Sequence, residues 1–356
     1  MNIDCLMMNL PDNIDSALIV TPENRRYFTD FESSDGILVV TRKGSIFFTD
    51  SRYIEAAQKT ITCCDVAEGK KVYEQIRDFL NSVNAENIAV EQSGITLAQF
   101  ENLKKNDNLK SFELIGDDSL DKAIGVLRQV KSEAETAKIR YAQSIAEMAF
   151  EHILDFIKVG RTEKEIQLEL DFFILKNGAE ALSFDTIAVS GVNSSMPHGV
   201  PSHKKIENGD FITMDFGAVV DGYHSDMTRT VAVGFVTDEQ REVYETVLSA
   251  QMNALSVLKA GVACADADKA ARDIIAAKGY GDFFGHGTGH GVGIEIHEKP
   301  NLSPRSDAIL HTGNIVTVEP GIYLPGKFGV RIEDMAFITE NGFENLTKSE
   351  KSLIIL

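Results

Sequence analysis

The sequence has few cysteines and no long apolar run, and both shortages narrow the classes of protein that it can encode. Its four cysteines, Cys5, Cys63, Cys64 and Cys264, include no C-x-x-C spacing. This argues against a disulfide framework and a zinc–thiolate site, and it favours a reducing compartment. No apolar segment approaches the roughly 18 residues that span a bilayer, and the N-terminus lacks the basic stretch of a signal peptide. We therefore expect a cytoplasmic protein with no membrane partner.

Positive charge is also scarce. The chain has 35 Lys and Arg residues against 54 Asp and Glu residues, which gives a formal net charge of -19. A surface of this charge repels the phosphate backbone, so we expect no nucleic-acid partner. The length of 356 residues allows two domains, and a hydrophobic content of 43% is enough for a sizeable core.

The first part of the chain alternates strand-like and helix-like segments. Apolar runs typical of strands occupy residues 16–20, 36–40, 45–48 and 87–90, and helical patterns lie near residues 52–59, 72–82 and 97–105. The alternation predicts an α/β domain over residues 1–123, with the polar stretch 116–125 as a connector. Residues 124–356 are expected to form a second domain.

Longer helices are expected in the second domain, arranged as two similar pairs. Capping boxes open three of them: Ser132 with Glu135, Thr162 with Glu165, and Thr237 with Gln240. A fourth is expected from about Asp266. Glycines with the same spacing end the helices of both pairs: Gly160 and Gly178, then Gly261 and Gly279. The repeated order predicts two halves related by an internal pseudo-twofold, with the functional site between them.

The segment GHGTGHGVGIEIHE is rich in histidine and glycine. Every second residue from Gly285 to Gly293 is glycine, which argues against a helix that would place His286 and His290 on one face. We expect a glycine loop that runs into a strand, with one face formed by Val292, Ile294 and Ile296 and the other by Glu295 and His297. A lone histidine on such a strand is more often structural than functional, so this segment alone does not establish a site.

Two acidic residues are expected to converge on a first hairpin. The dipeptide Asp221-Gly222 is typical of a two-residue turn, which would pair Val220 with Tyr223. The same register places Asp215 and Asp226 as diagonal neighbours on one face of the sheet, close enough for their side chains to meet.

A second hairpin is expected around Pro325-Gly326. Glu319 and Glu333 are placed symmetrically about Gly326, so they would face each other across the ladder. Like charges in such positions destabilise a sheet, and two dications would balance the four negative charges of both hairpins. Single acidic residues usually decorate solvent-exposed faces, so the metal hypothesis rests on the set.

These residues resemble those of the "pita-bread" metallopeptidases, a family that includes aminopeptidase P, prolidase and methionine aminopeptidase. The strings that carry the resemblance lie within residues 130–356: SFDTIAVSGVNSSMPHG, MDFG, GYHSDMTRT, GHGTGHGVGIEIHE, TVEPGIY and GVRIED. The segment ALIVTPENRRYFTDFESSDG resembles the creatinase/prolidase N-terminal domain, although Asp30 stands where relatives usually have glycine. This domain argues against methionine aminopeptidase. The resemblance implies an α/β N-terminal domain and an α+β pita-bread catalytic domain.

The resemblance also implies a metal centre. Five residues are expected to bind two divalent ions: Asp215, Asp226, His290, Glu319 and Glu333. Such a ligand set favours Mn(II), Co(II), Zn(II) or Fe(II) over copper(I) without choosing among them. Mn(II) is the ion that we expect. Two such ions can share a water and lower its pKa, which would generate the hydroxide that attacks the scissile carbonyl. Glu319 is expected to shuttle the proton from that water.

Five side chains outside or beside the metal centre are implied to meet the substrate. His198 and His297 match histidines that hydrogen-bond the substrate carbonyl and the developing charge. His286, Tyr323 and Arg331 match residues that line the pocket on the proline side.

The expected activity is that of an Xaa-Pro aminopeptidase, which acts on peptides with proline at the second position. Prolidases, which are Xaa-Pro dipeptidases, typically bind the free carboxylate with an arginine soon after the HE motif. Here Asn301 stands at that place, and Arg305 is the nearest basic residue. Prolidase is therefore the alternative, and a non-catalytic peptide-binding module is a further one. A homodimer is also implied.

Overall fold

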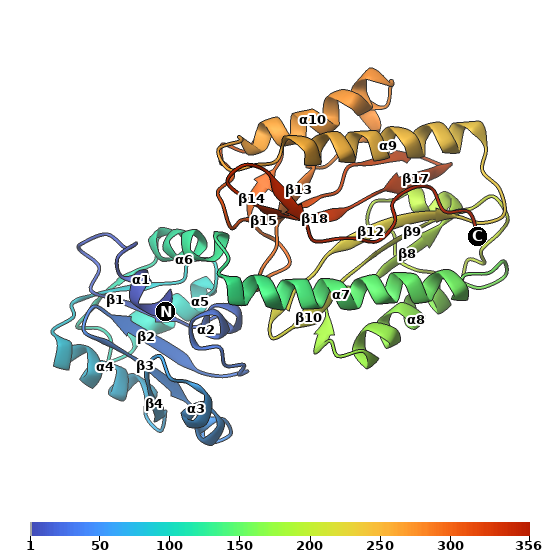
Figure 1. The fold of residues 1–356 in the computed structure, drawn as a ribbon. Coiled ribbons are helices and arrows are strands. Elements are labelled where there is room, and N and C mark those ends of the chain that lie inside the picture. The colour runs from blue at the N-terminus through green and yellow to red at the C-terminus, as the bar shows by residue number, and fades with distance from the viewer. Residues whose placement is uncertain (1) are drawn as a thin grey trace. The chain divides into compact units, whose positions relative to one another are not determined.

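The computed structural model describes residues 2–356, which divide between Arg128 and Gln129 into two compact units (Figure 1). A mixed six-stranded sheet of order β4-β3-β2-β1-β5-β6 forms the first unit. Its strands are β1 (Ser16–Ile19), β2 (Ile37–Thr41), β3 (Gly44–Thr49), β4 (Asp65–Glu68), β5 (Asn87–Val90) and β6 (Glu113–Ile115). Its helices are α1 (Asn2–Leu6), α2 (Pro22–Thr29), α3 (Ile54–Thr60), α4 (Val72–Val83), α5 (Leu97–Lys105) and α6 (Ser119–Gln129). The expected α/β domain is confirmed.

The connector expected at residues 116–125 is wrong, because α6 begins within it. Leu120, Ala123 and Ile124 are buried on one face of α6, which supplies the apolar contact that a connector would lack. The structure divides after Arg128, whereas the sequence placed the division after residue 123, which lies inside α6. The precise domain limits stay a prediction.

Asp30, which departs from the usual glycine, follows the last residue of α2. It adopts the left-handed conformation with φ 53°, and its N–H donates to the carbonyl of Arg26. Aspartate tolerates this conformation better than most residues. The helix therefore ends in a left-handed C-cap without glycine.

The second unit contains the four long helices that were expected. They are α7 (Glu133–Phe156), α8 (Glu163–Lys176), α9 (Asp238–Val257) and α10 (Cys264–Ala277). All three predicted capping boxes are confirmed by reciprocal hydrogen bonds, at Ser132, Thr162 and Thr237. The pair α7–α8 lies on one side of the strands of this unit and the pair α9–α10 on the other (Figure 1).

The strands of the second unit form several small sheets. The first half supplies β7 (Ala181–Leu182), β8 (Ile187–Ser190), β9 (Phe211–Phe216), β10 (Ala218–Val220), β11 (Tyr223–His224) and β12 (Met227–Ala232). The second half supplies β13 (Gly289–Gly291), β14 (Glu298–Leu302), β15 (Ile315–Val318), β16 (Gly321–Leu324), β17 (Phe328–Arg331), β18 (Asp334–Ile338) and β19 (Phe343–Asn345). The sheet orders are β11-β10-β7, β12-β9-β8, β14-β13-β15-β18-β19 and β16-β17. Two 3₁₀ helices are η1 (Gly191–Ser195) and η2 (Gly281–Phe283).

Each helix pair covers a hydrophobic core of its own. One core joins residues of α7 and α8, such as Ile145 and Leu170, to Met214 of β9. The other joins residues of α9 and α10, such as Val247, to Val316 of β15. The two cores follow the repeated element order, so the unit consists of two similar halves with strands between the helix pairs.

The strand expected over residues 292–297 is not formed. This stretch bends between β13 and β14, with Val292 and Ile294 buried and His297 exposed. The bend is held by Glu298, whose Oε1 accepts from the N–H of Glu295 at 3.2 Å. A Cβ on Gly293 would lie 2.4 Å from Oε2 of Glu298, so a larger residue there would displace the carboxylate that holds the bend.

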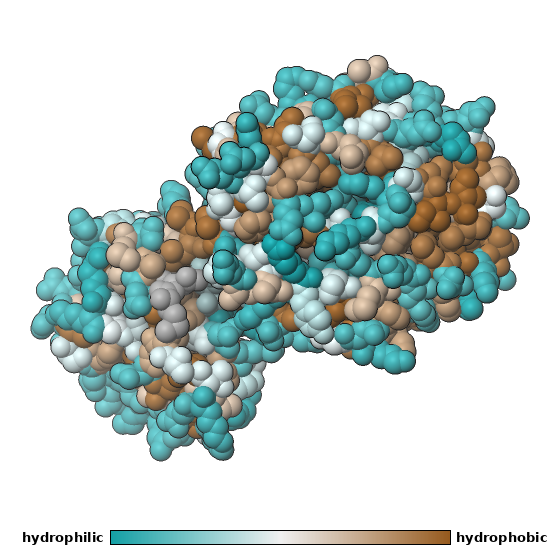
Figure 2. Space-filling model, viewed as in Figure 1, coloured by the Kyte–Doolittle hydropathy of each residue, from teal (hydrophilic) through white to brown (hydrophobic). Residues whose placement is uncertain are grey.

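Hydrophilic side chains cover much of the surface seen in Figure 2, as is usual for a chain in which 25% of the residues are charged. Within the described part of the chain, none of the helices has both the length and the apolar character that crossing a bilayer requires.

Candidate active site

The first predicted hairpin has the expected turn and register. Asp221 and Gly222 have φ values of 47° and 80°, and Val220 pairs with Tyr223. The same register continues into β9 and β12, where Thr228 lies opposite Asp215. Asp215 lies in β9 and Asp226 immediately precedes β12, so the two aspartates lie near the same end of the ladder.

The second predicted hairpin is also confirmed. Gly326 has φ 74°, and β16 pairs with β17 so that Gly321 lies opposite Arg331. Beyond them β15 pairs with β18 in the same register, with Val318 opposite Asp334. Glu319 and Glu333 therefore lie opposite each other between the two ladders, where their side chains enter the space between the halves.

His290, on β13, joins the two pairs of carboxylates. Its Nε2 lies 3.5 Å from Oδ2 of Asp226 and 3.6 Å from Oε1 of Glu319. One ligand atom from each of Asp226, His290 and Glu333 lies within 4.8 Å of the others. The structure thus brings together all four carboxylates and the imidazole that the sequence analysis selected.

The orientation of the His290 ring suits a metal ligand. Its Nδ1 lies 3.0 Å from the carbonyl oxygen of Gly291, which can only accept a hydrogen bond. The proton of the neutral ring is therefore on Nδ1, and Nε2 presents its lone pair to the carboxylates. Burial lowers the pKa of His290 to about 4, which keeps the ring neutral at physiological pH.

Two carboxylate oxygens at this centre are buried without a hydrogen-bond partner among the described residues. Oδ2 of Asp215 accepts from Arg331, and Oε2 of Glu333 accepts from Oγ1 of Thr228 at 2.7 Å. The second oxygens, Oδ1 of Asp215 and Oε1 of Glu333, have none. Buried oxygens of this kind are costly unless a cation binds them. The donor set therefore fits divalent metal ions.

The electrostatics of the centre agree with this interpretation. Burial and the neighbouring Glu333 and Asp215 carboxylates raise the pKa of Asp226 above its usual range. The pKa of Glu333 is raised by burial and by Glu319 and Asp215. Burial raises the pKa of Glu319 to about 8, against the opposing effect of Arg331. Without added cations, burial and mutual repulsion therefore favour the protonated forms of Asp226, Glu319 and Glu333.

Arg331, Tyr323 and His286 form a hydrogen-bonded chain beside the acids. Arg331 donates from Nη2 to Asp215 at 2.6 Å and from Nη1 to the hydroxyl of Tyr323 at 2.9 Å. Nδ1 of His286 lies 2.8 Å from the carbonyl of Gly287, so its Nε2 accepts from the Tyr323 hydroxyl at 2.9 Å. Burial lowers the pKa of His286 to about 4, which keeps Nε2 unprotonated.

A cavity of about 510 Å³ opens over these residues. All ten residues that the sequence analysis selected line it: Asp215, Asp226, His290, Glu319, Glu333, His198, His297, His286, Tyr323 and Arg331. His198 and His297 are exposed, and the His297 ring contacts that of His290 with centroids 4.4 Å apart. Asn301 and Ser303 also line the cavity, whereas Arg305 is not among its lining residues.

Thr228 is a site residue that the sequence analysis missed. Its hydroxyl donates to Glu333 and accepts from Nε of Arg331 at 3.1 Å, so it fixes two of the selected side chains. The signal was available, because the predicted hairpin register places Thr228 opposite Asp215.

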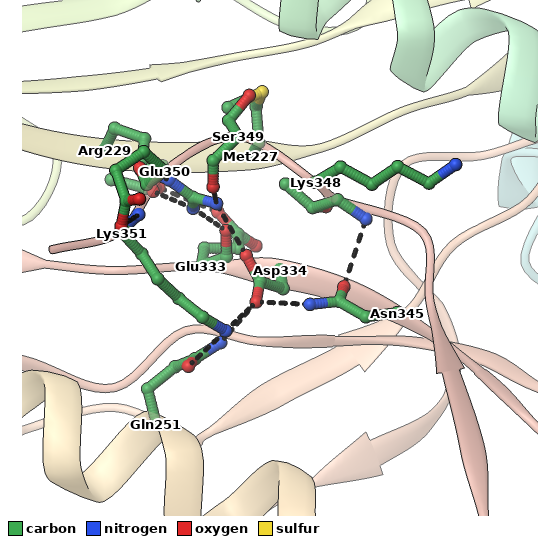
Figure 3. Close-up of polar contacts among 12 residues, drawn as sticks. Met227, Arg229, Gln251, Glu333, Asp334, Asn345, Lys348, Ser349, Glu350 and Lys351 are labelled. Atoms are coloured by element: carbon green, nitrogen blue, oxygen red, sulfur yellow. Dashed lines mark hydrogen bonds and ion pairs between the residues drawn. The ribbon is translucent and has the colours of Figure 1, made fainter.

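A buried ion cluster behind Glu333 was also missed. Asp334, fully buried, accepts from Arg229 at 2.8 Å and from Lys351 at 2.5 Å, and Figure 3 shows Gln251 and Asn345 reaching the same carboxylate. Arg229 also donates to the main-chain oxygen of Glu333 at 2.6 Å. The cluster therefore links the start of β18, next to Glu333, to the C-terminal segment.

Both units match known protein families. Residues 137–340 match the model of metallopeptidase family M24, and residues 11–116 match that of the creatinase/prolidase N-terminal domain. An Xaa-Pro dipeptidase of Pyrococcus furiosus is 39% identical over 96% of each chain. The structure of an Xaa-Pro dipeptidase from Bacillus anthracis is 42% identical over 99% of each chain, with a TM-score of 0.95. That of an X-Pro aminopeptidase from Thermotoga maritima is 39% identical, with a TM-score of 0.90, and covers 96% of this chain and 98% of its own.

Proposed function

Because the chain belongs to metallopeptidase family M24 and carries a creatinase/prolidase N-terminal domain, we propose that it is an Xaa-Pro dipeptidase. The observation that carries the proposal is that four carboxylates and one imidazole line a single cavity, and that two of their buried oxygens have no partner among the residues the structure describes. Relatives that bear the name Xaa-Pro dipeptidase support the substrate class.

Five residues would hold two divalent metal ions: Asp215, Asp226, His290, Glu319 and Glu333. When bound, such ions supply Lewis acidity and lower the pKa of water to near neutrality. Mn(II) is the ion that we expect, with Co(II), Zn(II) and Fe(II) as alternatives.

The protein's own side chains supply positioning and proton transfer. Glu319, which lines the cavity among the other acids, would accept a proton from the attacking water and deliver it to the proline nitrogen of the leaving group. His198 and His297, exposed at the cavity wall, would hydrogen-bond the scissile carbonyl and its developing charge. The Arg331–Tyr323–His286 chain would form a fixed wall on the proline side.

The aminopeptidase preferred by the sequence analysis is the second candidate. It is favoured by the Thermotoga maritima relative and by Asn301, which lines the cavity where an arginine would bind a free carboxylate. The dipeptidase relatives are at least as similar to this chain, and they move our preference to the dipeptide substrate. A homodimer in the cytoplasm belongs to the same proposal.

One assay separates the candidates. The purified protein is given Mn(II) and either Ala-Pro, Ala-Pro-Ala or, as a control, Ala-Ala. Faster hydrolysis of Ala-Pro supports the dipeptidase, and faster hydrolysis of Ala-Pro-Ala supports the aminopeptidase. If no peptide is hydrolysed and peptide binding is insensitive to a chelator, the chain is a peptide-binding module.

A further inference from the structure

A buried carboxylate holds the loop that carries His198. Glu163, the first residue of α8, has no exposed surface. Its Oε1 accepts from N and Oγ of Ser190, at 2.7 and 2.9 Å. Its Oε2 accepts from N and Oγ of Ser202, at 3.0 and 2.7 Å. Ser190 and Ser202 begin and end the segment that we call the His198 loop, residues 190–202, so one carboxylate binds both ends.

The middle of the His198 loop reaches the same carboxylate. Nδ2 of Asn193 lies 3.0 Å from Oε1 and 3.2 Å from Oε2 of Glu163. The charge is thus stabilised by main-chain N–H groups, hydroxyls and an amide, and by its place in the first turn of a helix.

Apolar packing contributes little to the outer part of this loop. Val192, Met196 and Val200 are 47%, 50% and 81% exposed. Other polar contacts to the loop include the Ser194 hydroxyl, which accepts from the N–H of Gly329, and the Pro197 carbonyl, which accepts from Arg331 at 3.2 Å. At the two ends, Lys204 donates to the Ser190 hydroxyl at 3.1 Å, and the N–H of Lys164 donates to the carbonyl of Ser202 at 3.0 Å. The conformation of the loop therefore depends mainly on hydrogen bonds. Most of the side-chain hydrogen bonds described for this loop are accepted by the carboxylate of Glu163.

The second half of the unit contains a comparable arrangement. Asp268 of α10 is 1% exposed, and its Oδ1 accepts from N and Oγ1 of Thr288, at 3.0 and 2.9 Å. Its partner Arg272 donates to the carbonyls of Phe284 and His286, at 3.0 and 2.8 Å. In both halves, then, an acid on the second helix holds a segment that carries a cavity histidine.

We propose that Glu163 is a positioning residue for the reaction: it fixes the His198 loop so that His198 faces the substrate. The role assigned to His198 rests on the proposed function. The geometry requires a two-oxygen acceptor, because the N–H groups of Ser190 and Ser202 meet different oxygens of Glu163. Glutamine offers one acceptor and one donor, so Glu163→Gln must leave one end of the loop facing an NH₂ group.

The kinetic test compares Glu163→Gln with Glu165→Gln. Glu165 lies in the same helical turn and makes the capping box with Thr162, a role that glutamine can also fill. We expect Glu163→Gln to lower kcat/KM for the Xaa-Pro substrate by about 10- to 100-fold, as misplaced catalytic groups do, with unchanged metal content. Glu165→Gln should retain nearly full activity. Wild-type kcat/KM in Glu163→Gln overturns the proposal.

A double-mutant cycle shows whether the effect passes through His198. If Glu163 acts by placing this histidine, Glu163→Gln should cost less than about 2-fold in kcat/KM when added to His198→Ala, because coupled residues are not additive. A loss that is the same in both backgrounds would contradict the positioning role and indicate a general effect on the fold.

Hydrogen exchange supplies a readout that does not depend on activity. In the metal-free protein, amides of residues 190–202 should exchange faster in Glu163→Gln than in Glu165→Gln. Unchanged exchange overturns the loop contact while leaving the peptidase function standing. A different outcome is that exchange is faster in Glu163→Gln but the wild-type protein hydrolyses no Xaa-Pro peptide. That outcome overturns the proposed function and, with it, the role of Glu163 in positioning His198 for the reaction. If Glu163→Gln does not fold, Ser202→Ala takes its place, because it removes one hydroxyl donor to Glu163. Amides of residues 190–202 should then exchange faster in Ser202→Ala than in the wild type, and unchanged exchange would overturn the proposal.

Discussion

Arg331 donates from Nη2 to Oδ2 of Asp215 over 2.6 Å and leaves Oδ1 of the same carboxylate buried without a partner among the described residues. One oxygen is held in place and the other is left for a cation. The guanidinium also partly offsets the repulsion among the acids, since it opposes the rise in pKa of Asp226, Glu319 and Glu333. Arg331 thus orients the Asp215 carboxylate and leaves one of its oxygens available for the proposed metal ion.

The metal-free protein should lose stability as the pH rises. A group whose pKa is raised on folding stabilises the folded state below its unfolded pKa, and this contribution disappears as the pH passes the folded pKa. For Glu319 the window runs from the ordinary value of 4.5 to about 8. We expect the Tm of chelator-treated protein to fall across this window by on the order of 5 °C, and Mn(II) to reverse the fall. Glu319→Gln should flatten the dependence; an unchanged slope would contradict the assignment.

Tyr323→Phe should impair catalysis without releasing metal. The change removes the hydroxyl that accepts from Arg331 and donates to His286, so the wall on the proline side loses both hydrogen bonds. We expect kcat/KM to fall by about 30-fold, since two lost bonds of roughly 1 kcal/mol each amount to about 2 kcal/mol. Elemental analysis should show unchanged metal content. Loss of metal would show that Tyr323 acts on the ligands instead.

Asp334→Ala should be strongly destabilising. It leaves the Arg229 guanidinium, which is 1% exposed, buried without its carboxylate. Removing one partner of such a pair costs about 3–5 kcal/mol, which urea unfolding would measure. The matched control is Glu344→Ala, which breaks the solvent-exposed pair with Arg140 and should cost no more than about 1 kcal/mol. Equal costs for both variants would contradict the importance of the buried cluster.

Asn301→Arg should shift the preference further toward dipeptides. The residue lines the cavity, so a guanidinium at this position can reach a free carboxylate after the proline. A hydrogen bond to a charged group is worth about 1.5–3 kcal/mol, so we expect the ratio of kcat/KM for Ala-Pro over Ala-Pro-Ala to rise at least about 10-fold. A ratio that does not change would place the substrate carboxylate elsewhere. Arg305→Ala is the control, because Arg305 does not line the cavity.

The register of both hairpins could be predicted from the sequence because turn dipeptides determine register. The turns at Asp221-Gly222 and Gly326 each determine which residues pair across the two strands, and this pairing determines the face on which each side chain lies. Glu319 and Glu333 could therefore be placed opposite each other before the structure was known. The capping boxes located the helices for a similar reason, since their partners lie three residues apart.

Features that depend on distant partners could not be predicted in this way. The bend at residues 292–297 arises because the Glu298 carboxylate lies against Gly293, and that carboxylate is itself held by the buried Lys131 at 2.9 Å. Likewise, Glu163 lies far in sequence from Ser202, and no local pattern distinguishes it from an ordinary helix-terminal acid. Such contacts are determined by packing between elements rather than by periodicity.

The most direct test of the account is anomalous X-ray diffraction from crystals grown with Mn(II). We predict two anomalous peaks among Asp215, Asp226, His290, Glu319 and Glu333, with the unpartnered oxygens of Asp215 and Glu333 at ligand distance. An empty centre in crystals that contain Mn(II), or peaks only at other places on the protein, would contradict the claim that these residues bind the catalytic metal.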